Sequence, residues 1–441
     1  MTFLTGWGRT APTPARLARP RSAEEVAELV RRAPGRGVAA RGLGRSYGDA
    51  AQNSGGLVLD CTALTSWSLD ESTGLVTAAA GVSLHDLMAA LVPRGWFVPV
   101  TPGTRYVTVG GAVAADVHGK NHHAESSFGA HLRSLILVTA DGGSRTLTPD
   151  SALFWATVGG MGLTGVITEA VFRCLPITTS RMRVDVERTR DLDHTLETMT
   201  ATDDRYRYTV AWIDLLASGG RMGRSVLTRG DHADRDELPR GADPLAFAPA
   251  SRLKAPPWAP NGLLNPVTVR AFNEAWYRRA RPRTGLVQGI APFFHPLDSV
   301  DGWNRVYGSN GFVQYQFVVP FGAEATLRRI VSRLSAEGVV SFLSVLKRFG
   351  PGTPGMLSFP VPGWTLALDI PAGRRGLAGL LREFDDWVAE SGGRIYLAKD
   401  SRMPAETMAA MYPRLGEWRK VRDEVDPGGV FRSDLARRLG L

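Results

Sequence analysis

The sequence predicts an α+β fold of two domains, and three observations lead to this expectation. The chain has 441 residues, which is too long for one ordinary hydrophobic core. Short strands, helices and glycine-rich loops alternate through about the first 175 residues, as they do in mixed folds. After about Met182 the predicted strands carry alternating apolar residues, which is typical of an antiparallel sheet with one covered face.

The first domain is expected to begin with a helix. The stretch 22–25 has a capping-box pattern, and apolar residues follow it at helical spacing until a Pro-Gly pair ends the helix. Three strands are then predicted at 38–40, 57–59 and 75–80, with a helix at 84–91 that Ser83 caps. Three glycine-rich loops lie in the same part of the chain, at 41–56, 101–115 and 158–165.

The second domain is expected to be a sheet accompanied by helices. Its predicted strands are 208–214, 312–320, 341–346 and 365–370, and its predicted helices are 323–337 and 376–391. Between 219 and 266 the chain is rich in Pro, Asp, Arg and Ala with weak periodicity, which predicts a long loop that is mobile without ligand. The last stretch, 396–441, is predicted to be helical and basic.

Composition narrows the classes of protein. The chain has 52 Lys+Arg and 43 Asp+Glu, a formal charge of +9, but the arginines are dispersed, so no nucleic acid partner is expected. Cys61 and Cys174 are too few for a disulfide framework or a cysteine-based metal site. The sequence has no secretory signal and no apolar run of about 18–20 residues. We therefore expect a cytoplasmic protein, or one peripherally associated with the membrane or cell envelope, the periplasmic face included.

The glycine-rich loops indicate a phosphate-bearing cofactor. The loop at 41–56 neither opens a helix with GxGxxG nor matches a P-loop, which disfavours a Rossmann dinucleotide site and excludes a P-loop. Its amides and Ser46 could hold a pyrophosphate, while a surface turn remains the alternative for this loop alone. In the loop at 101–115, small residues from Gly110 to Ala115 let backbone amides come close to a ligand.

A polar cluster follows these small residues directly. His118 adjoins Lys120, His122 and His123, and at least one of these side chains is expected to face a ligand. A lone histidine more often makes structural hydrogen bonds, and the H-x-x-x-H-H spacing predicts no metal site.

Further candidates lie near the C-terminus and in the sheet. Lys399 either forms a salt bridge with its neighbour Asp400 or serves a substrate as a cation or a base. Tyr47 and Tyr396 are candidates for proton relay or ring stacking. The alternation Gln314-Tyr-Gln316 places both amides on one strand face, which forms either a pocket wall or a solvated surface.

Ten separated motifs closely resemble the vanillyl-alcohol-oxidase/PCMH superfamily of FAD-dependent oxidoreductases. They are RGLGRSYGD (41–49), PGTRYVTVGGA (102–112), HGKNHH (118–123), FWATVGGMGLTG (154–165), AWID (211–214), FHPLD (294–298), QYQFVVP (314–320), AKDSR (398–402), MYPR (411–414) and DPGGVFRSD (426–434). The resemblance covers nearly the whole chain and implies a two-domain PCMH-type FAD-binding fold with an inserted antiparallel-sheet substrate domain. The FAD-binding domain would span 1–179 and the substrate domain 180–393, and a C-terminal segment at 394–441 would complete the FAD-binding domain.

The resemblance also implies where FAD lies. Its pyrophosphate would rest on the loops at 41–49 and 103–111. Some superfamily members tether the flavin through a His or Cys of the first loop, but Arg45 occupies the corresponding place here, so non-covalent FAD is expected. The expected cofactor contacts are Arg41, Gly42, Leu43, Gly44, Arg45, Ser46, Tyr47, Gly48, Asp49, Gly103, Thr108, Val109, Gly110, Gly111, Ala115, Asp116, Val117, His118, Ile167 and Tyr396.

The implied reaction is FAD-dependent oxidation of the 2′-hydroxyl of a polyprenylphosphoryl-β-D-ribofuranose to the 2′-keto sugar. This is the first half of a ribose-to-arabinose epimerisation for cell-wall arabinan precursors, which an NADH-dependent short-chain reductase would complete. Lys399 is the expected catalytic residue, with Tyr47 and His118 assisting. The expected substrate contacts are Lys120, Trp212, Gln314, Gln316, Lys347, Ala367 and Lys399. A lipid-linked substrate also favours peripheral contact with a membrane.

Two residues depart from the superfamily pattern. Ala367 replaces a Cys on the pocket strand, which removes a reactive thiol, and Phe294 stands where a Tyr is expected. Two other enzymes stay open: an aldonolactone- or alditol-type sugar oxidase that uses O2, and a homologue recruited to sugar or nucleoside metabolite biosynthesis. From another class, a flavin-binding or nucleic-acid-binding protein without turnover is the alternative.

Overall fold

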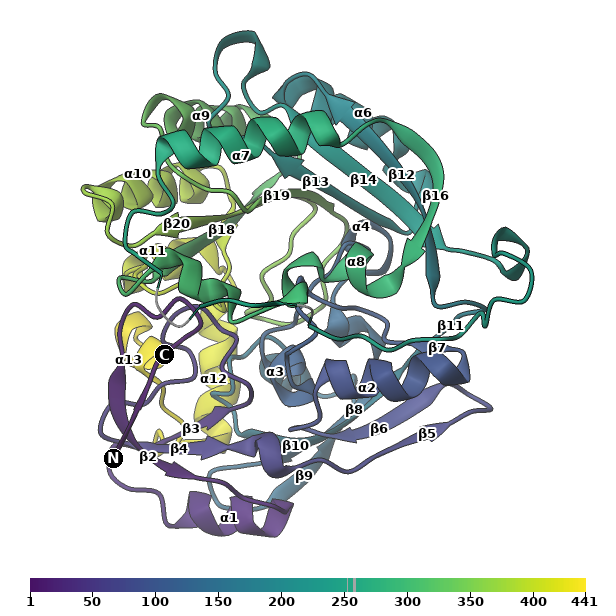
Figure 1. The fold of residues 1–441 in the computed structure, drawn as a ribbon. Helices are drawn as coiled ribbons and strands as arrows, with labels where there is room; N and C mark the ends of the chain where they lie inside the picture. The colour runs from purple at the N-terminus through teal and green to yellow at the C-terminus, as the bar shows by residue number, and fades with distance from the viewer. Residues whose placement is uncertain (252, 257–258) are drawn as a thin grey trace.

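The computed structural model describes residues 1–251, 253–256 and 259–441. Three β-sheets of four, five and eight strands form its framework. In Figure 1 the two smaller sheets lie in the lower part of the molecule and the eight-stranded sheet in the upper part. This arrangement confirms the predicted α+β class with an antiparallel second sheet. The division into 1–179, 180–393 and 394–441 stays a prediction, although β21 at Arg394–Ile395 pairs with the large sheet.

The four-stranded sheet has the order β1-β2-β4-β3. Its strands are β1 (Thr2–Leu4), β2 (Thr13–Ala18), β4 (Leu57–Asp60) and β3 (Val38–Arg41). Helix α1 (Ala23–Arg31) follows β2, and the Ser22 side chain caps it by accepting a hydrogen bond from the amide of Glu25. The predicted helix start and its Ser22 cap are therefore confirmed, but the capping box is incomplete, because the Glu25 carboxylate accepts from the amide of Arg21 and not from that of Ser22.

The five-stranded sheet is antiparallel and has the order β5-β6-β10-β8-β9. Its strands are β5 (Trp67–Asp70), β6 (Leu75–Ala79), β10 (Val166–Arg173), β8 (Leu132–Val138) and β9 (Ser144–Leu147). Helices α2 (Leu84–Leu91), α3 (Val109–Ala114), α4 (His122–Glu125) and α5 (Ala152–Thr157) belong to the same part of the chain. The pair β7 (Trp96–Phe97) and β11 (Leu175–Pro176) stands at the passage to the upper sheet.

The eight-stranded sheet is antiparallel throughout and has the order β16-β12-β14-β13-β19-β20-β18-β21. Its other strands are β16 (Arg283–Gly289), β12 (Arg181–Thr189), β14 (Ser225–His232), β13 (Tyr208–Ile213), β19 (Ser344–Phe349), β20 (Gly363–Pro371) and β18 (Phe312–Pro320). One face packs in a hydrophobic core with α6 (Leu192–Thr202), α9 (Glu324–Ala336) and α10 (Leu377–Glu390). The opposite face carries the candidate site, with α7 (Pro266–Arg279) and α8 (Ile290–Phe294) on that side.

Of the three C-terminal helices, the last two return to the lower part of the molecule, and the first lies higher, beside α10 (Figure 1). They are α11 (Ala405–Met411), α12 (Leu415–Val425) and α13 (Asp434–Leu439). Phe431 forms a parallel bridge with Val38 of β3, and the Asp434 carboxylate accepts hydrogen bonds from Thr13 and the amide of Ser54. The N-terminal and C-terminal ends of the chain thus pack together in one part of the molecule.

Three sequence predictions of secondary structure need correction. The expected long loop at 219–266 contains β14, an interior strand, whose pairing with β12 and β13 outweighs its weak local pattern. The strand expected at 341–346 is β19 at Ser344–Phe349, because the Ser341 hydroxyl donates to the carbonyl of Leu343 and holds a turn there. The small-residue run from Gly110 is helical, because Thr108 caps α3. No helix in the described ranges is long and apolar enough to cross a membrane.

Candidate active site

Three distant segments meet beneath the large sheet. Gly42 presses on Thr108 so closely that an added Cβ would lie 2.2 Å from the threonine hydroxyl. The amide of Tyr47 donates to the carbonyl of Ala398 over 2.9 Å. The Tyr396 hydroxyl donates to the carbonyl of Ala115 over 2.8 Å. The first glycine-rich loop, the α3 segment and the C-terminal segment therefore surround one region.

The first loop offers a row of open backbone donors. Within the part of the chain that the structure describes, the amides from Gly42 to Ser46 donate to no protein group. Gly44 adopts a φ of +64°, and the Arg41 guanidinium holds the loop by donating to the carbonyls of Thr5 and Ala51. Consecutive unpaired amides in such a turn form a concave anion site, which suits a pyrophosphate.

The second loop differs from this pattern. The amide of Val109 donates to the carbonyl of Val82, and the amide of Gly110 donates to the carbonyl of Ala80. The amide of Gly111 donates to the Thr108 hydroxyl. The amides of Val109, Gly110 and Gly111 therefore already have partners, unlike the amides from Gly42 to Ser46 in the first loop.

Two acidic residues among the expected cofactor contacts hold protein segments together. Asp49 forms a two-pronged ion pair with Arg438 of α13, at 2.8 and 2.9 Å. Asp116 is buried and accepts from the amide of Gly129 and from the hydroxyls of Thr353 and Ser358. Both carboxylates link regions far apart in sequence.

The remaining expected cofactor contacts are placed as follows. Arg45 lies over the ring of Trp7, with 3.9 Å from its guanidinium carbon to the ring centre. The carbonyl of Ser46 accepts from the amide of Trp7. An added Cβ at Gly48 would meet the carbonyl of Asp400 at 2.0 Å. Leu43 and Gly103 are exposed, and Val117 and Ile167 are buried.

The face of the large sheet above these loops is unusually polar. Cross-strand pairing puts Gln314 opposite Asp369 and Gln316 opposite Ala367. Lys347 lies opposite Thr365, the next residue of β20 on this face. Since side chains alternate along a strand, these groups all point away from the α9 and α10 side. This confirms that the two glutamine amides share a face.

Lys399 lies between the sheet face and the first loop. Its Nζ is 3.8 Å from the centre of the Tyr47 ring. Burial lowers the pKa of Lys399 to about 7, against the attraction of the Asp369 carboxylate. Burial likewise raises the pKa of Asp369 to about 7, while the Gln314 amide and the charge of Lys399 oppose the shift. Burial also raises the pKa of the Tyr47 hydroxyl.

Lys347 is the centre of a second group of basic side chains. Burial lowers the pKa of Lys347 to about 8. Burial, reinforced by the charge of Lys347, lowers the pKa of Lys120 to about 7 and that of His122 to about 3. The Lys120 ammonium donates to the carbonyl of Phe293. The two lysines suit an anionic substrate group, whereas His122 is neutral at pH 7.

His118 presents an unused donor. The Gln316 amide lies 2.9 Å from its Nε2 and also reaches the Thr365 hydroxyl, so Nε2 accepts and the ring proton is assigned to Nδ1. That Nδ1 has no partner among the described residues. Burial holds the pKa of His118 well below its usual value, so the ring is neutral at pH 7. A neutral buried histidine with a free N–H is suited to donate to a ligand.

The structure adds residues that sequence reasoning missed. Asp369 was missed, although it follows Ala367 by two positions and so shares its face of β20. Tyr307 was missed because its hydroxyl reaches Asp369, at 3.4 Å, from a distant 3-10 turn. Trp212, predicted as a substrate contact, lies on the same face and donates its indole N–H to the carbonyl of Phe342.

Comparisons with known proteins agree with this architecture. A model described as an FAD binding domain matches residues 14–148, and one described as D-arabinono-1,4-lactone oxidase matches residues 377–439. The chain is 49% identical to decaprenylphosphoryl-beta-D-ribose oxidase of Mycolicibacterium smegmatis, over 99% of this chain and 97% of that protein. The chain belongs to the decaprenylphosphoryl-β-D-ribose oxidase family.

More distant relatives share the scaffold. L-gulono-1,4-lactone dehydrogenase of Mycobacterium tuberculosis is 26% identical over 98% of this chain and 97% of its own length. Alditol oxidase of a Streptomyces species is 29% identical, over 38% of this chain and 40% of its own. The match to decaprenylphosphoryl-beta-D-ribose oxidase extends over the large sheet as well as the FAD-binding part, and the predicted superfamily is confirmed.

FAD is the cofactor of this family member, and the residues present fit it. The open amides at 42–46 suit its pyrophosphate, and the free Nδ1–H of His118 is a buried donor for it or for a substrate. Non-covalent attachment stays a prediction, based on Arg45 in the place of a tether. In the described residues, no three His, Cys, Asp or Glu side chains gather to hold a metal ion.

The two departures from the superfamily pattern have different surroundings. Ala367 is partly accessible on the site face of β20. Phe294 is buried against Phe97 and Tyr208, with ring centres 5.2 and 4.8 Å away. Phe294 therefore fills a core beside Lys120, and its missing hydroxyl leaves an apolar wall there.

Proposed function

We propose that the enzyme oxidises the 2′-hydroxyl of a polyprenylphosphoryl-β-D-ribofuranose to the 2′-keto sugar. The observation that carries this proposal is the 49% identity to decaprenylphosphoryl-beta-D-ribose oxidase along nearly the whole chain. The partly buried lysines beside the sheet face support it, because a phosphorylated sugar needs both an anion site and a proton acceptor. The L-gulono-1,4-lactone dehydrogenase and the alditol oxidase are much more distant relatives.

Lys399 is proposed to take the hydroxyl proton. A pKa near 7 leaves much of its amine unprotonated at neutral pH, which is the condition for a general base. The Tyr47 ring packs against the ammonium group and the Asp369 carboxylate attracts it, so both would orient the amine. Bound FAD supplies the acceptor for the hydride that leaves the 2′-carbon.

Lys347 and Lys120 are proposed to hold the phosphate. Neither has a carboxylate partner in the described residues, and a phosphate would restore the charge balance that burial disturbs. Gln314 and Gln316 would bind sugar hydroxyls, and Ala367 and Trp212 would line the route past them. His118 would position the ring by donation from Nδ1.

The keto product indicates which class of enzyme would act next. A 2′-keto sugar becomes the arabinose epimer when hydride adds to the opposite face, so we propose an NADH-dependent short-chain reductase as the consuming partner. The prenyl chain of the substrate also implies contact with a membrane surface.

Anaerobic reduction of the bound flavin tests the reaction. The purified yellow protein should bleach with a prenylphosphoryl ribose and keep its colour with L-gulono-1,4-lactone or xylitol. Bleaching by the lactone or alditol alone would overturn the proposal in favour of a soluble-sugar oxidase. Acid precipitation of the same preparation should leave the flavin in the supernatant, as non-covalent FAD requires.

A further inference from the structure

Helix α7 exposes large apolar side chains along most of its length. Only Val269 and Asn273 of this helix are buried. Val267 is 77% exposed, Trp276 is 45% exposed and Phe272 is 43% exposed. Ten large hydrophobic side chains are exposed in the described chain, and five of them fall within residues 253–276. Such clustering marks an interaction surface rather than scattered exposure.

The two aromatic rings of α7 form one unit. Phe272 and Trp276 are four residues apart, so they lie on the same side of the helix, and their rings stack at 6.1 Å. The helix is anchored from beneath, where Asn273 donates to Asp214 over 2.7 Å and Glu274 pairs with Arg224 over 2.6 Å. The aromatic pair is therefore held at the surface by a firmly attached helix.

A longer segment that includes α7 carries most of the net charge of the chain. Residues 244–297 contain seven Lys and Arg and a single acidic residue, Glu274. This segment thus holds +6 of the formal charge of +9. Glu274 is already paired with Arg224 and Arg278, so it neutralises none of the arginines further along.

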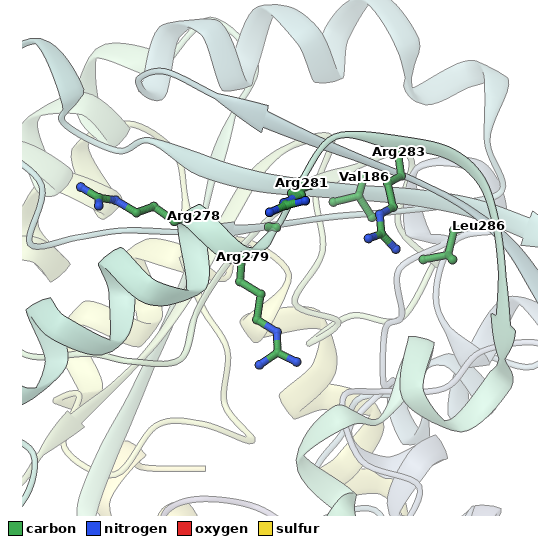
Figure 2. Close-up of a pocket in the computed structure, with 7 residues that line it drawn as sticks. Val186, Arg278, Arg279, Arg281, Arg283 and Leu286 are labelled. Carbon is green, nitrogen blue, oxygen red and sulfur yellow. The ribbon is translucent and has the colours of Figure 1, made fainter.

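An arginine-lined cavity of about 690 Å³ opens where α7 turns into β16. Val186, Leu286, Arg278, Arg279, Arg281 and Arg283 line it (Figure 2). The guanidinium groups of Arg279 and Arg283 point to the same side in Figure 2. Among the described residues, Arg279, Arg281 and Arg283 form no ion pair. The cavity therefore combines three arginines that have no carboxylate partner among the described residues with the apolar side chains of Val186 and Leu286.

This surface is continuous with the candidate active site. On the site face of the sheet, Gln316 lies opposite Ala367, Ala367 opposite Val345, and Val345 opposite Trp212. The ring of Trp212 is 6.5 Å from that of Trp276. A lane of small and apolar side chains thus runs from the sugar-binding glutamines to the exposed aromatic pair.

We propose that Phe272, Trp276, Arg279, Arg281 and Arg283, named here the docking surface, seat the enzyme on an anionic lipid bilayer. The inference rests on the proposed function, since the apolar lane would lead a prenyl chain from the site to that bilayer. Exposed aromatic rings insert at the headgroup boundary, and arginines attract anionic lipids. The charge complementarity and the apolar lane together favour a lipid surface over a protein partner.

Vesicle co-sedimentation of the FAD-loaded enzyme tests the proposal. The enzyme should sediment with vesicles of equal parts phosphatidylcholine and phosphatidylglycerol, and far less with phosphatidylcholine alone. The double variant Arg279→Gln/Arg283→Gln should bind the anionic vesicles roughly 30-fold more weakly, at about 1 kcal/mol for each arginine. Phe272→Ser should weaken binding at high salt, where the electrostatic part is screened.

A matched control removes two charges elsewhere. Arg375 and Arg382 are exposed near and on α10, which covers the opposite face of the sheet. Arg375→Gln/Arg382→Gln should bind vesicles like the wild type. If both double variants lost vesicle binding equally, or if the wild type did not bind anionic vesicles, the proposed docking surface would be wrong. The exposed side of α7 would then be assigned to a protein partner.

Activity in solution separates this proposal from the proposed function. Flavin reduction by a soluble, short-prenyl phosphoryl ribose should be the same in wild type and Arg279→Gln/Arg283→Gln. If no phosphoryl ribose reduces the wild-type flavin, the proposed function fails whatever the vesicles show. If reduction proceeds but sedimentation does not depend on Arg279 and Arg283, only the docking surface fails.

Discussion

Two groups of cations lie on the same face of the eight-stranded sheet and differ in nearly every physical respect. The inner group is Lys399, Lys347 and Lys120, enclosed between the sheet and the FAD-binding loops. The outer group is Arg279, Arg281 and Arg283, at the exposed edge formed by α7 and β16. Burial brings the pKa of each inner lysine toward the physiological range, whereas the outer arginines remain in water.

The choice of residue matches each environment. The chain has only five lysines, and three of them belong to the inner group, although Lys and Arg together number 52. Arginine keeps its proton at any physiological pH, but a buried lysine can lose it. The inner group can therefore exchange protons and adjust its charge to a ligand, while the outer group provides permanent charge for an anionic surface.

The largest expected effect comes from removing the inner amine that lies over Tyr47. Lys399→Ala should lower the rate of flavin reduction by prenylphosphoryl ribose by about 10³-fold, within the range for loss of a general base. The bound flavin should remain, because the open amides at 42–46 are untouched. Stopped-flow absorbance at the flavin band measures both quantities.

Lys420 provides the control for this change. It is exposed on α12, away from the site, and Lys420→Ala should reduce its flavin at the wild-type rate. If Lys399→Ala reduced its flavin at a rate within threefold of wild type (roughly 0.6 kcal/mol in the activation barrier), Lys399 would not be the base. The functional contrast between the two groups of cations would then be lost.

The next largest effect is expected at Lys347, on both substrate binding and protein stability. Lys347→Met should raise the KM for the phosphorylated substrate roughly 10- to 100-fold, because a charge-assisted contact to phosphate is lost. The same variant should be more stable than wild type at pH 7 by about 1–2 kcal/mol, after allowance for the water that Lys347 still meets. Urea unfolding and substrate titration measure the two changes.

The stability gain should depend on pH. Burial lowers the pKa of Lys347 to about 8 in the folded protein, whereas an unfolded lysine titrates near ~10.4. Between these values the unfolded chain retains a proton that the folded protein has lost, so wild-type stability rises with pH. The advantage of Lys347→Met should therefore be full below pH 8 and vanish above about pH 10. A constant advantage would mean that the lysine charge is not the cause.

The inner group shows how far sequence alone can reach. The motif around Lys399 and the alternation of Gln314 and Gln316 were readable, because period-two strands and short motifs are local signals. Asp369 obeys the same alternation on β20 and could have been found by it. Its electrostatic effect on Lys399 could not, since the two residues come near each other only after the C-terminal segment returns beneath the sheet.

The fold was predictable to a similar degree. Capped helices such as α1 and α2 carry their own start signals, and both were predicted from them. β14 was not, because its sequence has no clear alternation and the neighbouring strands on each side define it. The docking surface was also hidden, since exposure of Phe272 and Trp276 depends on which face of α7 the sheet covers.

A smaller effect should separate the contributions of Lys399 and Asp369, whose charges influence each other. Asp369→Asn keeps an acceptor for Gln314 but removes the charge that raises the pKa of Lys399 against burial. The amine should then be unprotonated at lower pH, so the rising limb of the flavin-reduction rate should move to lower pH. The exposed Asp193, changed to Asn, should leave the profile unchanged. A shift of Asp369→Asn to higher pH would contradict the assigned role.

The smallest effect is expected for a substitution in the outer group, and it gives the clearest contrast with the inner lysines. Arg279→Gln should change the free energy of unfolding by less than about 0.5 kcal/mol, because an exposed arginine that pairs with no carboxylate of the described residues loses little hydration on folding. That small difference should also stay constant from pH 6 to pH 10, since arginine remains charged throughout in both states. Urea unfolding at the pH values used for Lys347→Met gives a direct comparison. If Arg279→Gln instead produced a large or pH-dependent change, the outer cations would be part of the folded core, and permanent charge for a lipid surface would no longer describe them.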